Sequence, residues 1–164
     1  AVVMIYVAAR FQFKFSVGAV MSLFHDVIII IGMFALFQWE FDLTVMAALL
    51  AVIGYSLNDT IVVDDRIREN FRILREGDST YIINESLTQT LDRTLMTSAT
   101  TALVVLALML FGGDMIHNFS VAMMIGLVVG TYSSIYISAN ILLAMNISRE
   151  DLMPPELEEI DDRP

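Results

Sequence analysis

Asp59 and Arg93 stand where the sequence is otherwise apolar enough to lie in a membrane. Asp59, preceded by Asn58, comes about sixteen residues after Leu43, which begins a long apolar segment, so it lies roughly 24 Å into a hydrocarbon core about 30 Å thick. Arg93 opens the next apolar segment and lies at a similar level. Charged residues in hydrocarbon are costly, and they pair with one another or carry protons. Two interpretations therefore remain open: a static ion pair between helices, or a protonation switch.

A second acid lies still deeper in the preceding apolar segment. His25 and Asp26 are about nine and ten residues into it, roughly 14 Å from its start and close to the membrane midplane. Gly18, Ser22 and Asp26 recur at i, i+4 spacing, so we expect Asp26 to face a neighbouring helix rather than lipid. Asp26 is then either a buried, hydrogen-bonded acid or part of a proton relay.

The elements that must position these residues are long helices. The chain is 57% hydrophobic, above the about 45–50% of soluble domains. Segments 16–37, 43–63, 94–113 and 120–145 each reach the about 20 residues needed to span a membrane. Residues 1–9 are apolar but too short to span, and we expect them to be the end of a helix whose start is missing. The sequence predicts an all-α, polytopic membrane bundle over residues 1–149.

Other kinds of chemistry have little support in the sequence. The chain has no cysteine, so it offers neither a disulfide nor a thiolate metal site. We find no His, Asp and Glu group with metal-ligand spacing, no nucleophile–base pair and no phosphate-binding glycine loop. We therefore expect no metal, no cofactor and no enzyme active site, and we do not expect the chain to bind nucleic acid.

The basic residues predict the orientation of the spans. If the spans alternate, all nine lysines and arginines fall on one side, which the positive-inside rule assigns to the cytoplasm. The acidic tail, residues 150–164, lies on the same side and is expected to be solvated. Trp39 and Phe41 suit the opposite interface as aromatic belt residues. The sequence thus predicts a cytoplasmic C-terminus.

The connection 64–92 is predicted to be more than a loop. Ile67, Phe71 and Leu74 recur at i, i+4 and i+7 with arginines between them, which indicates an amphipathic helix on the membrane surface. Gly77 and Asp78 should end this helix, and a second helix should start near Ser79 and lead into the next span.

The last span carries a stripe of small residues. Gly126 and Gly130 form a GxxxG pair that Ser134 and Ser138 continue, and such a stripe lets another helix approach closely. Hydroxyl side chains near Arg93 either satisfy one another or form a proton path: Thr97, Ser98, Thr100 and Thr101.

Several stretches resemble the SecD/SecF family of protein-export membrane proteins, part of the resistance-nodulation-division (RND) superfamily. Along the chain they are "SLFHDVIIIIG" (22–32), "GYSLNDTIVVDDRIRENFR" (54–72), "SLTQTLDRTLMTSATT" (86–101), "FGG" (111–113) and "IGLVVGTYSSIYIS" (125–138), and the family has them in the same order. The SLNDT…DDRIREN wording resembles the SecF branch more than its paralogue SecD. The resemblance covers nearly the whole chain to about Arg149 and implies half of an RND-type bundle. It also implies that the family's first span and periplasmic domain are missing here.

The resemblance further implies a function. Family members use the proton-motive force to assist preprotein export across the bacterial inner membrane, with SecD, the SecY–SecE–SecG channel and YajC as partners. The acid of the SLND motif and the arginine of the RTL motif are the family's proton-handling pair, here Asp59 and Arg93, and we add Asn58 and Asp26 as candidates. This favours the protonation switch.

One residue departs from the family pattern, and other functions stay open. Asp64 stands where an apolar or small residue is common, and no role is expected of it. The alternatives are the SecD half, a proton-driven RND-type exporter of small molecules, and a scaffold that handles no protons.

Overall fold

The computed structural model describes residues 13–74 and 77–147, and within these ranges the chain is helical with short connections. The all-α prediction is confirmed. The helices are α2 (Phe13–Phe37), α3 (Leu43–Ile73), α4 (Ser79–Phe111), α5 (Asp114–Tyr132), a π-helix η1 (Ser133–Ile137) and α6 (Ser138–Ala144). Helices α2, α3, α4 and the run from α5 to α6 are long and apolar enough to cross a membrane. The expectations for residues 1–9 and 150–164 concern positions outside the described residues.

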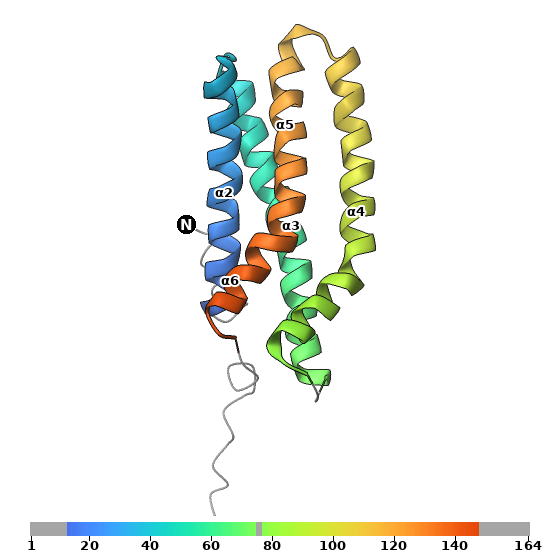
Figure 1. Ribbon diagram of the computed structural model, residues 1–164. Helices are drawn as coiled ribbons and strands as arrows, with labels where there is room; N and C mark the ends of the chain where they lie inside the picture. The colour runs from blue at the N-terminus through green and yellow to red at the C-terminus, as the bar shows by residue number, and fades with distance from the viewer. Residues whose placement is uncertain (1–12, 75–76, 148–164) are drawn as a thin grey trace, which may run out of the picture.

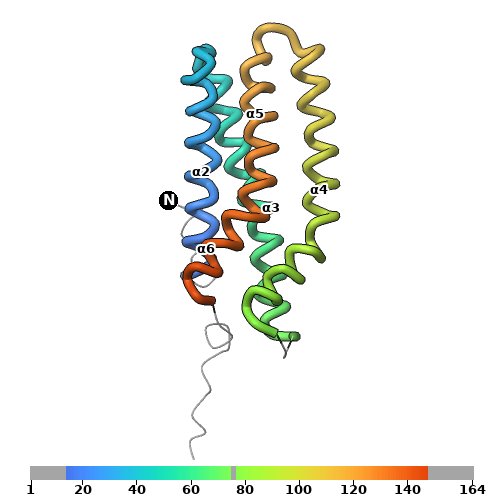
Figure 2. The backbone as a smooth tube through the Cα atoms, in the orientation of Figure 1, coloured from blue at the N-terminus to red at the C-terminus, as the bar shows by residue number. Residues whose placement is uncertain are grey.

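Consecutive helices run in opposite directions, and α3 and α5, which run the same way, form the central pair of the bundle (Figure 1). Helix α2 packs against α3, α5, η1 and α6, whereas α4 packs mainly against α3 and α5 and stands at one side. Figure 2 shows that α6 turns away from the line of α5 and lies beside the first turns of α2. The end where α3 finishes and α4 begins is called the inner end below.

Two helices extend beyond the spans that the sequence predicts. Helix α3 continues past residue 63 to Ile73, so the connection is no separate surface helix but the last turns of α3 and the first turns of α4. Ile67 and Phe71 are buried against Ile82 and Ile83. The apolar side of the amphipathic pattern therefore serves helix-to-helix packing at the inner end.

Close contact between α3 and α5 depends on the glycine stripe. A methyl group placed on Gly126 would overlap the side chain of Val52, and one on Gly130 would lie 3.3 Å from Cβ of Ser56. The two helices run parallel, so successive turns of one meet successive turns of the other, and Val52 packs in a core cluster with Ala122. The stripe thus faces a helix of the same bundle.

The outer start of α3 is capped by Asp42. Its carboxylate accepts hydrogen bonds from Thr44 Oγ1 at 2.7 Å and from the Val45 amide at 2.9 Å. The Thr44 hydroxyl, followed by the Val45 amide, lowers the pKa of the Asp42 carboxyl below its usual range. An N-cap acid of this kind satisfies amides that the first turn leaves without partners.

We predict that Gly126→Ala destabilises the bundle, because its new methyl group overlaps Val52. Overpacking a close helix contact typically costs about 1–3 kcal/mol. Gly32→Ala is the matched control, since no atom lies within 4 Å of its added methyl group and alanine favours a helix. Thermal unfolding in detergent should place Gly126→Ala below the wild type and Gly32→Ala at or above it. Equal unfolding temperatures for the two variants would contradict the close contact.

A second prediction concerns the cap. The folded pKa of Asp42 is lowered, so its stabilising effect is present above the unfolded pKa and is lost as the pH falls through the folded one. Asp42→Ala should therefore lower the unfolding temperature near neutral pH and do so less in acid. Asp42→Asn keeps an accepting oxygen and should be milder at neutral pH. A pH-independent effect of Asp42→Ala would argue against the cap.

Candidate functional site

Asp59 lies in the centre of the bundle and is 7% exposed. Thr94 Oγ1 of α4 donates a hydrogen bond to its Oδ1 at 3.0 Å, and Ser134 Oγ of η1 donates to its Oδ2 at 2.7 Å. The three residues come from three different elements, so this carboxylate joins α3 to α4 and to η1. Each hydroxyl also replaces one of the hydrogen bonds with water that a carboxylate loses when it is buried.

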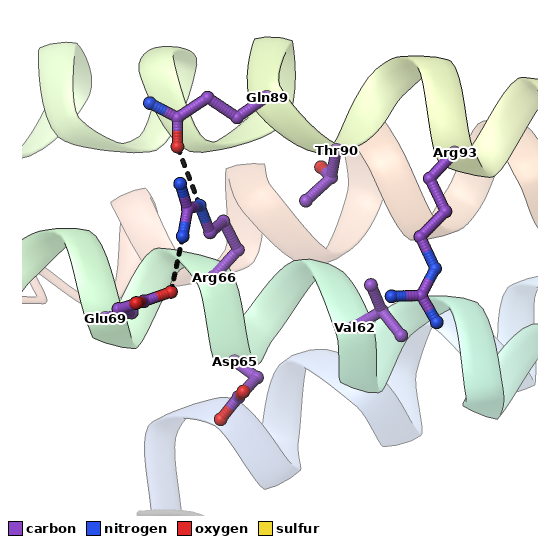
Figure 3. Close-up of a pocket in the computed structure, with 7 residues that line it drawn as sticks. All are labelled: Val62, Asp65, Arg66, Glu69, Gln89, Thr90 and Arg93. Carbon is purple, nitrogen blue, oxygen red and sulfur yellow. Dashed lines mark hydrogen bonds and ion pairs between the residues drawn. The ribbon is translucent and has the colours of Figure 1, made fainter.

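The expected ion pair between Asp59 and Arg93 is not formed. Among the described residues, the ion pairs are those of His25 with Asp26 and of Arg66 with Glu69. Arg93 is exposed and lines a recess of about 360 Å³ at the inner part of α3 and α4, together with Val62 (Figure 3). Arg93 lies at the level that the sequence predicts, but the next residue, Thr94, is the one that turns towards Asp59.

Asn58 is another candidate that the structure does not bring into the site. It is exposed, because it lies about 100° around α3 from the buried Asp59.

Asp26 forms a second buried carboxylate on α2, 1% exposed. Ser56 Oγ of α3 donates to its Oδ2 at 2.6 Å, and Nδ1 of the half-buried His25 lies 3.2 Å from its Oδ1. Gly130 of α5 lies against this contact, since a methyl group there would be 3.6 Å from Asp26 Oδ2. Ser56 precedes Asp59 by less than one turn, so the two carboxylates lie on neighbouring levels of the bundle.

Asp64 is the residue that sequence reasoning underrated. It is 3% exposed and accepts a hydrogen bond from Ser138 Oγ at 3.2 Å. The charged context "VVDDRIR" suggested the end of a membrane span, yet α3 continues and turns Asp64 inward. Its spacing from Ile67 and Phe71 along the buried face of α3 is the signal that could have found it.

A cluster of three hydroxyl groups joins α3, α4 and α5. Ser98 Oγ lies 2.7 Å from Thr131 Oγ1 and 3.1 Å from the Tyr55 hydroxyl, which links α4 to α5 and α3. The described residues contain no group of His, Cys, Asp and Glu suited to a metal ion. What the arrangement offers chemically is a set of buried acids that hydroxyls hold and that can gain or lose a proton.

The comparisons with known proteins agree on one family. The model of "Protein export membrane protein SecD/SecF, C-terminal" matches residues 1–148. Protein translocase subunit SecF of Pseudomonas aeruginosa is 53% identical over 163 residues, which cover 99% of this chain and 53% of that protein. The Vibrio alginolyticus protein of the same name is 54% identical over 166 residues, with coverages of 99% and 53%. The chain thus spans about half the length of these relatives.

A solved structure has the same arrangement of helices. The crystal structure of SecDF in its super-membrane-facing form matches with a TM-score of 0.85 and 46% identity, over 88% of this chain and 20% of that one.

We predict that Ser134→Ala destabilises the bundle more than Ser133→Ala. Ser134 donates to the Asp59 carboxylate, whereas the neighbouring Ser133, equally buried, donates only to the Gly130 carbonyl. Loss of a donor to a buried charged group typically costs about 1–3 kcal/mol. The measurement is thermal unfolding of both variants, alone and combined with Asp59→Ala, which removes both accepting oxygens. If the Ser134→Ala effect is unchanged in the Asp59→Ala background, the contact contributes nothing.

Proposed function

The chain belongs to the SecD/SecF family of protein-export membrane proteins, and from this premise we propose that it is the membrane-spanning part of an auxiliary Sec translocase subunit driven by the proton-motive force. Relatives named protein translocase subunit SecF support the SecF branch over SecD. The multi-pass bundle lies in the bacterial inner membrane, with its inner end and C-terminus in the cytoplasm.

The observation that carries the proposal is the burial of Asp59 between hydroxyl donors of two other elements. An ionised Asp59 accepts both hydrogen bonds and holds α4 and η1 to α3. A proton on one carboxyl oxygen makes that oxygen a donor, so one of the two links must reverse or break. Protonation of Asp59 therefore changes how firmly α4 is held.

The energy of one proton is sufficient for such a change. One elementary charge crossing about 100 mV yields about 2.3 kcal/mol. A typical internal hydrogen bond contributes about 0.5–1.5 kcal/mol net. One proton per cycle can thus offset the loss of a link to Asp59.

Arg93 takes part through a movement of α4. This helix is the one best placed to move, since 11% of its most apolar stretch is buried, against 44% for α3. Arg93 and Thr94 are adjacent, so a rotation of α4 by about 100° exchanges the hydroxyl beside Asp59 for the guanidinium. Thr94 holds Asp59 in the state described here, and Arg93 pairs with it in the other.

Asp26 passes protons towards Asp59 from the outer side. Ser56 connects it to α3 less than one turn before Asp59, and this short separation supports the relay. Asn58 faces outward and has no part in the transfer.

The partners follow from the same family. SecD covers the exposed side of α3 and α4, where Asn58 and Arg93 would otherwise meet lipid; polar groups at this depth favour a protein neighbour. The assembled protein works with the SecY–SecE–SecG channel and YajC on an emerging preprotein. A solved SecDF is described as a translocon-associated membrane protein, which supports this assignment.

We predict that Asp59→Asn abolishes the gradient-dependent part of export while the protein still folds. Asparagine keeps the size and one accepting oxygen of the side chain but cannot take up a proton. The measurement is preprotein transport into inverted membrane vesicles, with and without an imposed proton gradient, using the full-length subunit with SecD.

Asp92→Asn is the control. It removes the same charge from an exposed position beside Arg93 and should behave as the wild type. Wild-type gradient dependence of the Asp59→Asn protein would refute the proposed function.

A further inference from the structure

Asp64 is a third acid inside the bundle, and the proposed proton transfer through Asp26 and Asp59 does not use it. Its side chain is 3% exposed, and Ser138 Oγ is the hydroxyl that donates to it, at 3.2 Å. Ser138 is itself fully buried and lies against α2, where a methyl group on Gly18 would come within 3.3 Å of its Oγ. Asp64 is thus enclosed where α2, α3 and α6 meet.

The surroundings of Asp64 repeat those of Asp59 one level further in. Asp59 is bound by Ser134 and Asp64 by Ser138, so two acids of one helix meet two serines of the parallel run from η1 to α6. The acids are five positions apart, about 7.5 Å along α3, and the serines four apart. Two pairs, each of one acid and one serine, thus follow one another along these parallel helices.

No described cation neutralises Asp64. Among the described residues, the ion pairs are elsewhere, at His25 with Asp26 and at Arg66 with Glu69. Helix α2 presents Phe15, Gly18 and Ala19 near this level, and α6 presents Ser138, Ala139 and Leu142. The basic residues nearest in sequence on the helices around Asp64 are Lys14 of α2 and Arg66 and Arg68 of α3, all closer to the inner end. Arg66 pairs with Glu69, and Lys14 Nζ donates to the Asn146 carbonyl. Asp59 is the titratable group on the outer side.

A buried acid with one hydroxyl partner and no counter-charge from residues 13–74 and 77–147 is costly as a purely structural feature. An apolar residue at this position in the core would cost less, because leaving charged groups buried without partners is strongly destabilising. Burial of an acid beside a proton-handling acid is what a transfer path requires.

We propose that Asp64 is a second proton-carrying residue, which receives the proton released by Asp59 and passes it to the cytoplasmic side. This rests on the proposed function of Asp59. The O–H bond of the Asp59 carboxyl breaks and one forms on Asp64, while Ser134 and Ser138 each accept one proton and donate another. Asp59 becomes ionised, Asp64 becomes neutral, and the net charge of the pair is unchanged. Ser138 acts as a positioning residue.

The test compares Asp64→Asn with Asp64→Glu in the full-length subunit assembled with SecD. Asparagine keeps a hydrogen-bond acceptor for Ser138 but carries no proton, whereas glutamate keeps the carboxyl group. We expect Asp64→Asn to lower gradient-dependent export by at least about tenfold, and Asp64→Glu to restore most of it. Infrared spectra should show a titrating carboxyl band that Asp64→Asn lacks while it retains the wild-type unfolding temperature.

The controls separate this inference from the proposed function. Asp65→Asn removes the exposed acid next in sequence and should export as the wild type does. If Asp59→Asn abolishes gradient dependence while Asp64→Asn matches the wild type, the inference is wrong and the proposed function stands. If Asp64→Asn and Asp64→Glu are equally impaired, shape rather than proton transfer matters, and the inference is again wrong. If Asp59→Asn keeps the wild-type gradient dependence of export, both the inference and the proposed function are wrong.

Discussion

Hydrocarbon offers no hydrogen bonds, so an acid inside this bundle must find its donors on a neighbouring helix. Asp26 depends on Ser56, Asp59 on Thr94 and Ser134, and Asp64 on Ser138. Each of these bonds joins two elements, so the demand for donors fixes which helices must touch and at which level. The packing of the helices and the positions of the buried acids are therefore determined together.

The glycines of α5 make this packing possible. Gly126 and Gly130 bring the backbone of α5 against Val52 and Ser56, and the parallel course of the two helices then carries Ser134 to Asp59 and Ser138 to Asp64. A larger residue at either glycine would separate the helices at the outer levels. The acids further in would lose their donors without any change to the acids themselves.

Periodicity and composition were sufficient to predict the helical class, the level of Asp59 and the small-residue stripe. They did not predict which way a side chain points around its helix. Hydropathy gives the depth of a residue but not its angle around the helix, so Arg93 and Asn58 were assigned to a site that their neighbours Thr94 and Asp59 occupy. Composition also marks where a membrane ends rather than where a helix ends, which is why the continuation of α3 to Ile73 and the burial of Asp64 were missed.

The wide turn at Ser133–Ile137 makes the register of the inner end depend on a single residue. A π-helical turn holds one more residue than an α-helical turn, so the segment beyond it keeps the rotation that it would have if α5 continued as a regular helix without that residue. Deleting one residue within this turn would therefore leave Ser138, Ala139 and Leu142 facing the inner core. Deleting one residue of the regular part of α5 would instead rotate the residues before the gap by about 100° relative to those after it. A single-residue gap in a related sequence would thus preserve the side chains that face Asp64 only if it falls at this turn.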